Sequence, residues 1–137
     1  MYKKIVVPVD LAHADTLAKA LQTSADLARH YGAEITYVGV TTNLPSSVAH
    51  TAAEYQQKLE GFAGEQGRKF GIEIKAKTIV SHDPARDLDD RLGEEIRAEQ
   101  ADLVVMASHV PIFSDHVFAS NAGYLASHAT TSVFIVR

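Results

Sequence analysis

The 137-residue sequence contains no cysteine. It can therefore form neither a disulfide framework nor a thiolate metal site, and nothing in it asks for an oxidising compartment. Long apolar runs are also missing. The run from Ile5 to Val9 is far shorter than the ~20 residues of a membrane span, and too short for the core of a signal peptide. We therefore expect a cytoplasmic protein with no membrane partner.

An excess of positive charge is missing as well. The 13 Lys and Arg residues are outnumbered by 17 Asp and Glu, giving a net charge of −4. A negatively charged surface repels polyanions, so nucleic acid is not an expected partner. The chain also has no Gly-x-Ser-x-Gly elbow, no P-loop lysine motif and no Gly-x-Gly-x-x-Gly fingerprint, which are familiar catalytic and nucleotide-binding signatures.

What the sequence does have is enough apolar material for one core. Hydrophobic residues make up 46% of the chain, which suits a single domain over residues 1–137. Short β-branched runs alternate with longer segments. These runs cover residues 4–9, 34–40, 72–80, 103–106 and 132–136. Most are apolar on successive residues, as in strands covered on both faces, and this pattern predicts a buried parallel sheet.

The segments between the runs have helical spacing. Apolar residues recur every three or four positions at Leu17, Leu21, Ala25 and Ala28 and at Leu88, Leu92 and Ile96, while Leu59, Phe62 and Phe70 mark a longer central segment. Gly32 and Gly71 follow the first two segments as helix-ending glycines. Repeated strand–helix–strand order implies right-handed crossovers. The chain is therefore predicted to be an α/β protein, an open doubly wound parallel sheet with helices on both faces.

In such sheets ligands bind outside the carboxyl ends of the strands, where the strand order reverses. Asp10 follows the first strand there, although an Asp at this position can equally cap the following helix or turn. The second strand ends near Val40, and the turn-rich segment 41–45 follows it. This segment is predicted to form a loop over the same edge and to supply an apolar wall for a flat ring.

The fourth strand opens into a second candidate segment. It runs through residues 107–111 toward Ser120 and Asn121, which begin another helical stretch. Free backbone N–H groups at a helix start, joined by a hydroxyl and an amide, can hold a phosphate. A Ser-Asn pair is also a common helix cap, so the residues alone leave both interpretations open.

Other groups of polar residues are better explained by ordinary structural roles than by catalysis or metal binding. Ser108 and His109 are adjacent, and neighbours on one turn rarely bring a hydroxyl to an imidazole, so nucleophilic catalysis is not expected. The seven histidines are scattered without zinc-ligand spacing. The carboxylates between residues 83 and 95 alternate with arginines, which is typical of a solvated helix face.

Together, four segments resemble the universal stress protein family over essentially the whole chain. They are residues 5–10, 101–109, 119–121 and 132–137, in that order and spacing. The resemblance implies a five-stranded sheet of the adenine nucleotide alpha hydrolase-like type, a homodimer formed through the last strand, and bound ATP, with or without magnesium. It points to the branch with Ala-Ser-His in the phosphate loop, and to a stress-associated regulatory role with at most slow ATP hydrolysis.

Carried over residue by residue, the resemblance places Asp10 and Val40 at the adenosine end. The full set of binding residues that it implies is Pro8, Val9, Asp10, Val40, Met106, Ala107, Ser108, His109, Val110, Ala119, Ser120 and Asn121. ATP-binding members usually have glycine where this chain has Ala107, Val110 and Ala119. Each Cβ narrows the space for a phosphate. The alternative is therefore a dimeric interaction module of the same fold that binds no nucleotide.

Overall fold

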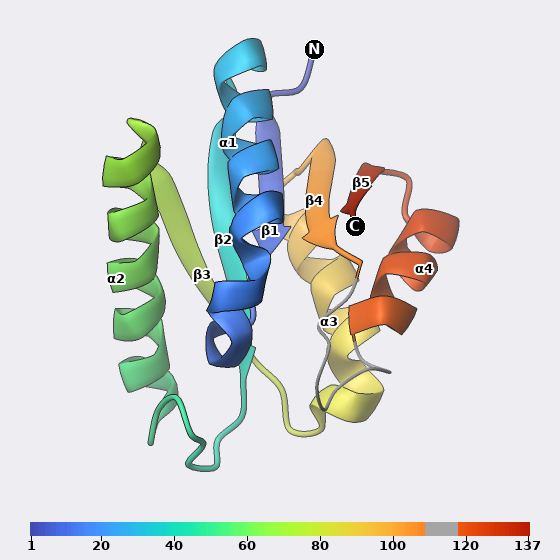
Figure 1. Ribbon diagram of the computed structural model, residues 1–137. Helices are drawn as coiled ribbons and strands as arrows, with labels where there is room; N and C mark the ends of the chain where they lie inside the picture. The colour runs from blue at the N-terminus through green and yellow to red at the C-terminus, as the bar shows by residue number, and fades with distance from the viewer. Residues whose placement is uncertain (109–117) are drawn as a thin grey trace.

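The computed structural model describes residues 1–108 and 118–137, and its centre is one parallel sheet (Figure 1). The strands are β1 (Lys4–Pro8), β2 (Glu34–Thr41), β3 (Ile74–Val80), β4 (Leu103–Ala107) and β5 (Ser132–Val136). They lie in the order β3-β2-β1-β4-β5, and every adjacent pair is parallel. The helical segments are η1 (Leu11–Leu17), α1 (Ala18–Tyr31), α2 (Ala52–Phe70), α3 (Pro84–Ala98) and α4 (Phe118–His128).

Helices cover both faces of this sheet. Because successive side chains of a strand point to opposite faces, Ile5 and Val7 of β1 pack into the core under α1 and α2, whereas Val6 packs into the core under α3 and α4 (Figure 1). Each of the three is 1% exposed. The prediction of an open doubly wound α/β sheet with helices on both faces is confirmed.

The helix ends also follow the sequence. Gly32 and Gly71 end α1 and α2 in the left-handed region, at φ of 66° and 69°, where a residue without Cβ avoids a steric penalty. The structure differs from the prediction at the start of β3, which begins at Ile74. The N–H of Ile72, two residues after α2 ends, donates to the carbonyl of Gly67 at 3.1 Å and so helps to close the helix end rather than pairing in the sheet.

Between β1 and α1 lies the 3-10 segment η1, which the helical spacing from Leu17 onward does not include. Its residues, Leu11–Leu17, form helical turns ahead of α1. Asp10 caps the segment, and non-helical angles at His13 separate it into two turns. This insertion turns the chain around the carboxyl end of β1 before α1 starts. Among the helices of the described residues, none has the length and apolar character needed to cross a bilayer.

Candidate functional site

The strand order reverses between β1 and β4, which lie side by side at the centre of the sheet. Their pairing ends at Val6 and Val104, whereas pairing of β1 with β2 continues to Pro8 and that of β4 with β5 continues to Ala107. The two central strands therefore separate before they end. This separation opens the carboxyl edge at the place where doubly wound folds bind ligands.

Asp10 stands at the tip of β1 and already makes two contacts. Its Oδ1 accepts a hydrogen bond from the backbone N–H of Ala12 at 3.0 Å, and its Oδ2 lies 2.9 Å from Nδ1 of His13. The capping interpretation is thus observed in the structure. A carboxylate has about four lone-pair sites, so Asp10 keeps acceptor capacity for a further donor at the edge.

A pocket of about 180 Å³ lies beside Asp10. One side is formed by Asp10 and Val40, the two residues placed at the adenosine end from sequence, and the structure brings them together. The other side comes from the segment between β2 and α2, including Ser46 and Val48. Because its walls combine a carboxylate, hydroxyl groups and valine side chains, the pocket suits a small group with both polar edges and an apolar face.

Tyr55 of α2 also lines this pocket, and the sequence argument did not single it out. Its pKa is raised well above the usual value, mainly because the ring is buried and secondarily because of the negative charge of Asp10. Tyr55 therefore remains a neutral phenol. The available signal was Gly39, because a glycine inside a strand often marks a close approach by another group. A Cβ at Gly39 would lie 2.5 Å from the Tyr55 hydroxyl oxygen.

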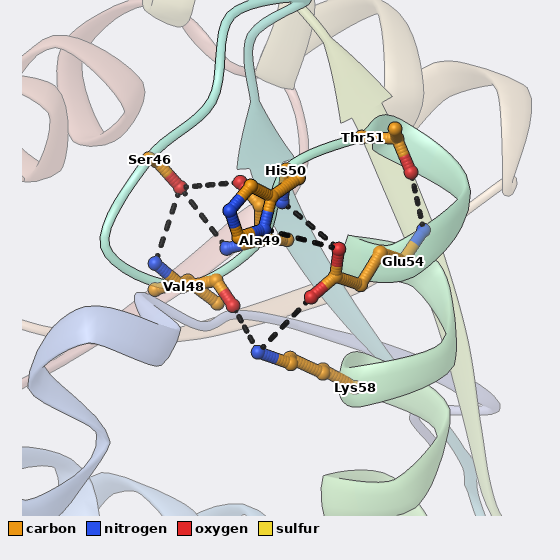
Figure 2. A network of polar contacts seen from close by, with 7 residues as sticks. All are labelled: Ser46, Val48, Ala49, His50, Thr51, Glu54 and Lys58. Atoms are coloured by element: carbon orange, nitrogen blue, oxygen red, sulfur yellow. Dashed lines mark hydrogen bonds and ion pairs between the residues drawn. The ribbon is translucent and has the colours of Figure 1, made fainter.

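The segment between β2 and α2, which lines the pocket, is held to α2 by polar contacts (Figure 2). Thr51 caps the helix, accepting the backbone N–H of Glu54 at 3.1 Å, while Glu54 accepts the backbone N–H of His50 at 3.0 Å. Lys58, one turn further along α2, donates to the carbonyl of Val48 and lies 3.5 Å from the Glu54 carboxylate. The loop wall thus has polar ties to the helix behind it.

The other predicted residues of β1 and β4 lie in the floor of the edge. Pro8 is buried, and Val9 and Met106 are each 1% exposed. Each residue is enclosed in the core, backbone included, so none of the three presents an open surface at the edge. Ala107 and Ser108 at the tip of β4 are half-buried, and the N–H of Ser108 donates to the carbonyl of Val136 at 2.8 Å.

Part of the predicted phosphate-binding segment lies outside the residues that the structure describes. His109 and Val110 lie outside the described residues. Ala119, Ser120 and Asn121 fall in the first turn of α4, where the structure describes the backbone. A helix start after β4 is therefore present where the sequence placed one.

Asp89 is a further residue whose environment the sequence missed. The core assignment of Leu88, Leu92 and Ile96 on α3 is correct, since they are 4%, 1% and 3% exposed. Asp89, however, is half-buried and lines a cavity of about 360 Å³ between α3 and α4 rather than a fully solvated face. Burial is the main cause that raises its pKa, followed by the charge of Asp90. No cluster of three or more potential metal ligands occurs in residues 1–108 and 118–137.

A five-stranded parallel sheet with helices on both faces defines the doubly wound α/β class, whose members bind ligands at the carboxyl edge of the sheet, and the pocket lies at this edge, at the ends of β1 and β2. Comparison with known proteins gives the family. The model of the universal stress protein family matches residues 1–137, so the chain belongs to this family.

Individual relatives agree with this assignment. Universal stress protein G of Salmonella typhimurium is 29% identical over 151 residues, covering 100% of both chains. A universal stress protein from Archaeoglobus fulgidus in complex with dAMP superposes with a TM-score of 0.68 at 22% identity, over 99% of this chain and 98% of that one. A universal stress protein in complex with cAMP gives a TM-score of 0.70 at 18% identity, over 99% and 97%. At this identity the two structures establish the shared fold.

Proposed function

We propose that this universal stress protein binds an adenine nucleotide, and ATP in particular, at the carboxyl edge between β1 and β4. The observation that carries the proposal is the pocket lined by Asp10 and Val40 at the carboxyl ends of β1 and β2, beside the strand-order reversal. Two proteins of the same fold were crystallised with the adenine nucleotides dAMP and cAMP. A stress-associated regulatory role follows from nucleotide binding within this family.

The dimensions of the site fit the nucleoside end of such a ligand. At about 180 Å³, the pocket is smaller than the ~300–1,000 Å³ of a typical small-molecule site and takes one ring rather than a whole nucleotide. Asp10 would accept a hydrogen bond from the nucleoside, and the valine side chains would cover the base. The phosphates would then extend toward the tip of β4, over Ala107 and the start of α4.

At that end the chain would use backbone N–H groups and short polar side chains. The residues proposed for the phosphate contacts are Ala107, Ser108, His109, Val110, Ala119, Ser120 and Asn121. A magnesium ion, where present, would neutralise phosphate charge. We also assign the chain to the Ala-Ser-His branch, on the residues 107–109 that carry this motif.

Isothermal titration with ATP and magnesium tests the proposal. We expect saturable heat and a rise in the thermal midpoint, because a ligand that binds only the folded state stabilises it. The variant Asp10→Ala should lose both effects. Because Asp10 also caps η1, Asp10→Asn is the control for capping: it keeps an oxygen for the Ala12 N–H but removes the charge. No heat and no stabilisation at millimolar ATP would refute the proposal.

A second candidate is a dimeric interaction module that binds no nucleotide. It is favoured by Ala107, Val110 and Ala119, which occupy glycine positions of ATP-binding members. The variant Ala119→Gly separates the two. A large gain of ATP affinity from an undetectable starting level supports the module, whereas tight binding that does not change on substitution removes its basis.

For either function we propose a homodimer formed through β5. This strand is an edge of the sheet, and Phe134 on it is 45% exposed. The opposite edge, β3, carries exposed Lys75 and Lys77, charges that discourage strand addition. Sedimentation should show a dimer at micromolar concentration, and Phe134→Lys should shift it toward the monomer. A wild-type monomer under these conditions would contradict the proposal.

Two further proposals concern the chain as a whole. We propose that residues 1–137 fold as a single domain, because the family model spans all of them. We also propose a cytoplasmic location, which agrees with the absence of cysteine. Limited proteolysis tests the first through resistance to internal cleavage, and cell fractionation tests the second.

A further inference from the structure

Part of the pocket that Asp10 lines is formed by a compact turn, which we call the 46–49 turn after its residues. The backbone N–H of Ser46 donates to the carbonyl of Ala49 at 2.8 Å. The Ser46 hydroxyl accepts the N–H groups of Val48 and Ala49, each at 3.2 Å (Figure 2). Ala49 is 3% exposed and packs in the core. These hydrogen bonds join the residues of the turn to one another, so we expect the turn to move as one unit.

Two side chains of α2 fix where this unit stands. The ammonium of Lys58 donates to the carbonyl of Val48, within the 46–49 turn, and also lies near the carboxylate of Glu54. Glu54 holds the backbone N–H of His50, the residue that follows the turn. In Figure 2 Lys58 and Glu54 reach the turn from the same side, so together they tie it to the first two turns of the helix.

These contacts of Lys58 and Glu54 hold a part of the pocket lining, although neither side chain lines the pocket itself. Ser46 and Val48 line the pocket, while Lys58 and Glu54 do not. The distance from the wall to Asp10 thus depends on a lysine that has no place in the lining. The Lys58–Glu54 pair is exposed, at 51% and 36% of the side chains, and exposed pairs contribute little to global stability.

We propose that Lys58 is a positioning residue for the ligand pocket: by holding the carbonyl of Val48, it keeps the 46–49 turn at the distance from Asp10 that admits the nucleoside end of the ligand. The inference rests on the proposed adenine-nucleotide binding. Without Lys58, the turn keeps its own hydrogen bonds and the contact between His50 and Glu54 but loses one of its contacts with α2, so holding it in position costs binding free energy. Lys58→Met should therefore weaken AMP and ATP binding about three- to tenfold.

The experiment compares three variants by isothermal titration with AMP and with ATP. Lys58→Met removes the donor, Lys58→Arg restores a cationic donor at the same place, and Lys69→Met makes the same charge change at the far end of α2. Lys58→Met should lose affinity equally for AMP and ATP, since the contact with the pocket concerns the nucleoside end. Lys58→Arg should recover most of it, and Lys69→Met should bind as the wild type does. A purely structural lysine would produce no such affinity pattern at an unchanged unfolding midpoint.

Amide hydrogen exchange of the ligand-free protein gives an independent readout. Lys58→Met should accelerate exchange at Val48, Ala49 and His50 while leaving the strand amides protected. Unchanged affinity of Lys58→Met for a nucleotide that the wild type binds would overturn the inference. If the wild type binds neither nucleotide, the proposed function fails. Unchanged exchange would then overturn the tie as well, whereas accelerated exchange would support it without a ligand.

Discussion

Tyr55 of α2 fills the space that a side chain at Gly39 of β2 would need, at the edge of the candidate site. A Cβ built on Gly39 would lie 2.5 Å from the hydroxyl oxygen of Tyr55 and 2.8 Å from a ring carbon. Real Cβ atoms do not approach other heavy atoms so closely. The tyrosine ring can therefore lie against the strand, in the pocket that Asp10 also lines, because residue 39 has no side chain.

The variant Gly39→Ala tests this match. Tyr55 is 4% exposed, so its ring has little room to move, and overpacking of this kind destabilises by about 1–3 kcal/mol. Urea unfolding at neutral pH measures the change. Gly61→Ala is the matched control, because Gly61 lies in α2 with no heavy atom within 4 Å of an added Cβ. It should stabilise the protein by roughly 0.5–1 kcal/mol. Equal stability of the wild type and Gly39→Ala would show that the ring is not fixed.

Gly32 tests backbone strain without crowding. Its φ is +66°, and nothing lies within 4 Å of an added Cβ. Gly32→Ala should therefore destabilise by about 1–2 kcal/mol through the left-handed conformation alone. Gly32→Asn should lose less, because asparagine tolerates this region better. Thermal unfolding of the three proteins should rank them Gly, Asn, Ala, and an alanine variant as stable as the wild type would contradict the assignment.

Glu54 should make the stability depend on pH in the acid range. Its pKa is lowered, mainly by the hydrogen bond from the backbone N–H of His50; desolvation opposes this lowering, and the contacts with Lys58 and His50 add to it. A carboxylate with a lowered folded-state pKa stabilises above its unfolded pKa, and this contribution is lost as the pH falls through the folded pKa. The stability difference between the wild type and Glu54→Gln should thus be largest near neutral pH.

Urea unfolding midpoints between pH 3 and pH 7 measure the effect. The two proteins should converge at the acid end, where Glu54 is protonated. Glu65→Gln, which changes an exposed glutamate further along α2, serves as control and should follow the wild type. A difference that stays constant across this range would mean that the charge of Glu54 contributes nothing.

The ionised carboxylate of Asp89 should lower the stability of the folded state, whereas that of Glu54 raises it. Burial raises its pKa, the charge of Asp90 raises it further, and His128 counteracts them. Since ionisation is unfavourable in the folded state, Asp89→Asn should stabilise the protein at neutral pH, and the gain should vanish as the pH falls below the unfolded pKa.

The control for this prediction is on the same helix. Asp87 lies exposed in the first turn of α3, where its charge is favourable toward the helix dipole. Asp87→Asn should be neutral or slightly destabilising at neutral pH. Chemical unfolding of both variants compares the signs, and a destabilised Asp89→Asn would show that the carboxylate has a structural partner.

The fold was predictable because its signals are local and repeated. Five apolar runs became five strands, since a strand covered on both faces must be apolar at successive positions. Gly32 and Gly71 marked helix ends because only a residue without Cβ takes the left-handed conformation at low energy. The start of β3 was misplaced by two residues because the end of α2 uses the N–H of Ile72.

The candidate site was predictable only in part. Asp10 and Val40 were located by the rule that parallel strands end at one edge. Tyr55 and Lys58 were missed because they lie on a helix, where no local pattern marks Tyr55 as a pocket residue or Lys58 as a partner of the loop; the one signal for Tyr55, Gly39, lies on a different element. Asp89 escaped for a related reason: on a helix with many charges, only packing against α4 distinguishes it from its exposed neighbours.

The separation of β1 from β4 after Val6 and Val104 has a consequence for the cost of ligand binding. Beyond this point each strand stays paired with the neighbour on its outer side, so both tips are held within the sheet without a ligand. The 46–49 turn, which lines the same pocket as Asp10, instead depends on a few polar contacts with α2 at the protein surface. Mutations in the sheet should therefore act on folding, while the strength of recognition can be adjusted from α2 without disturbing the core.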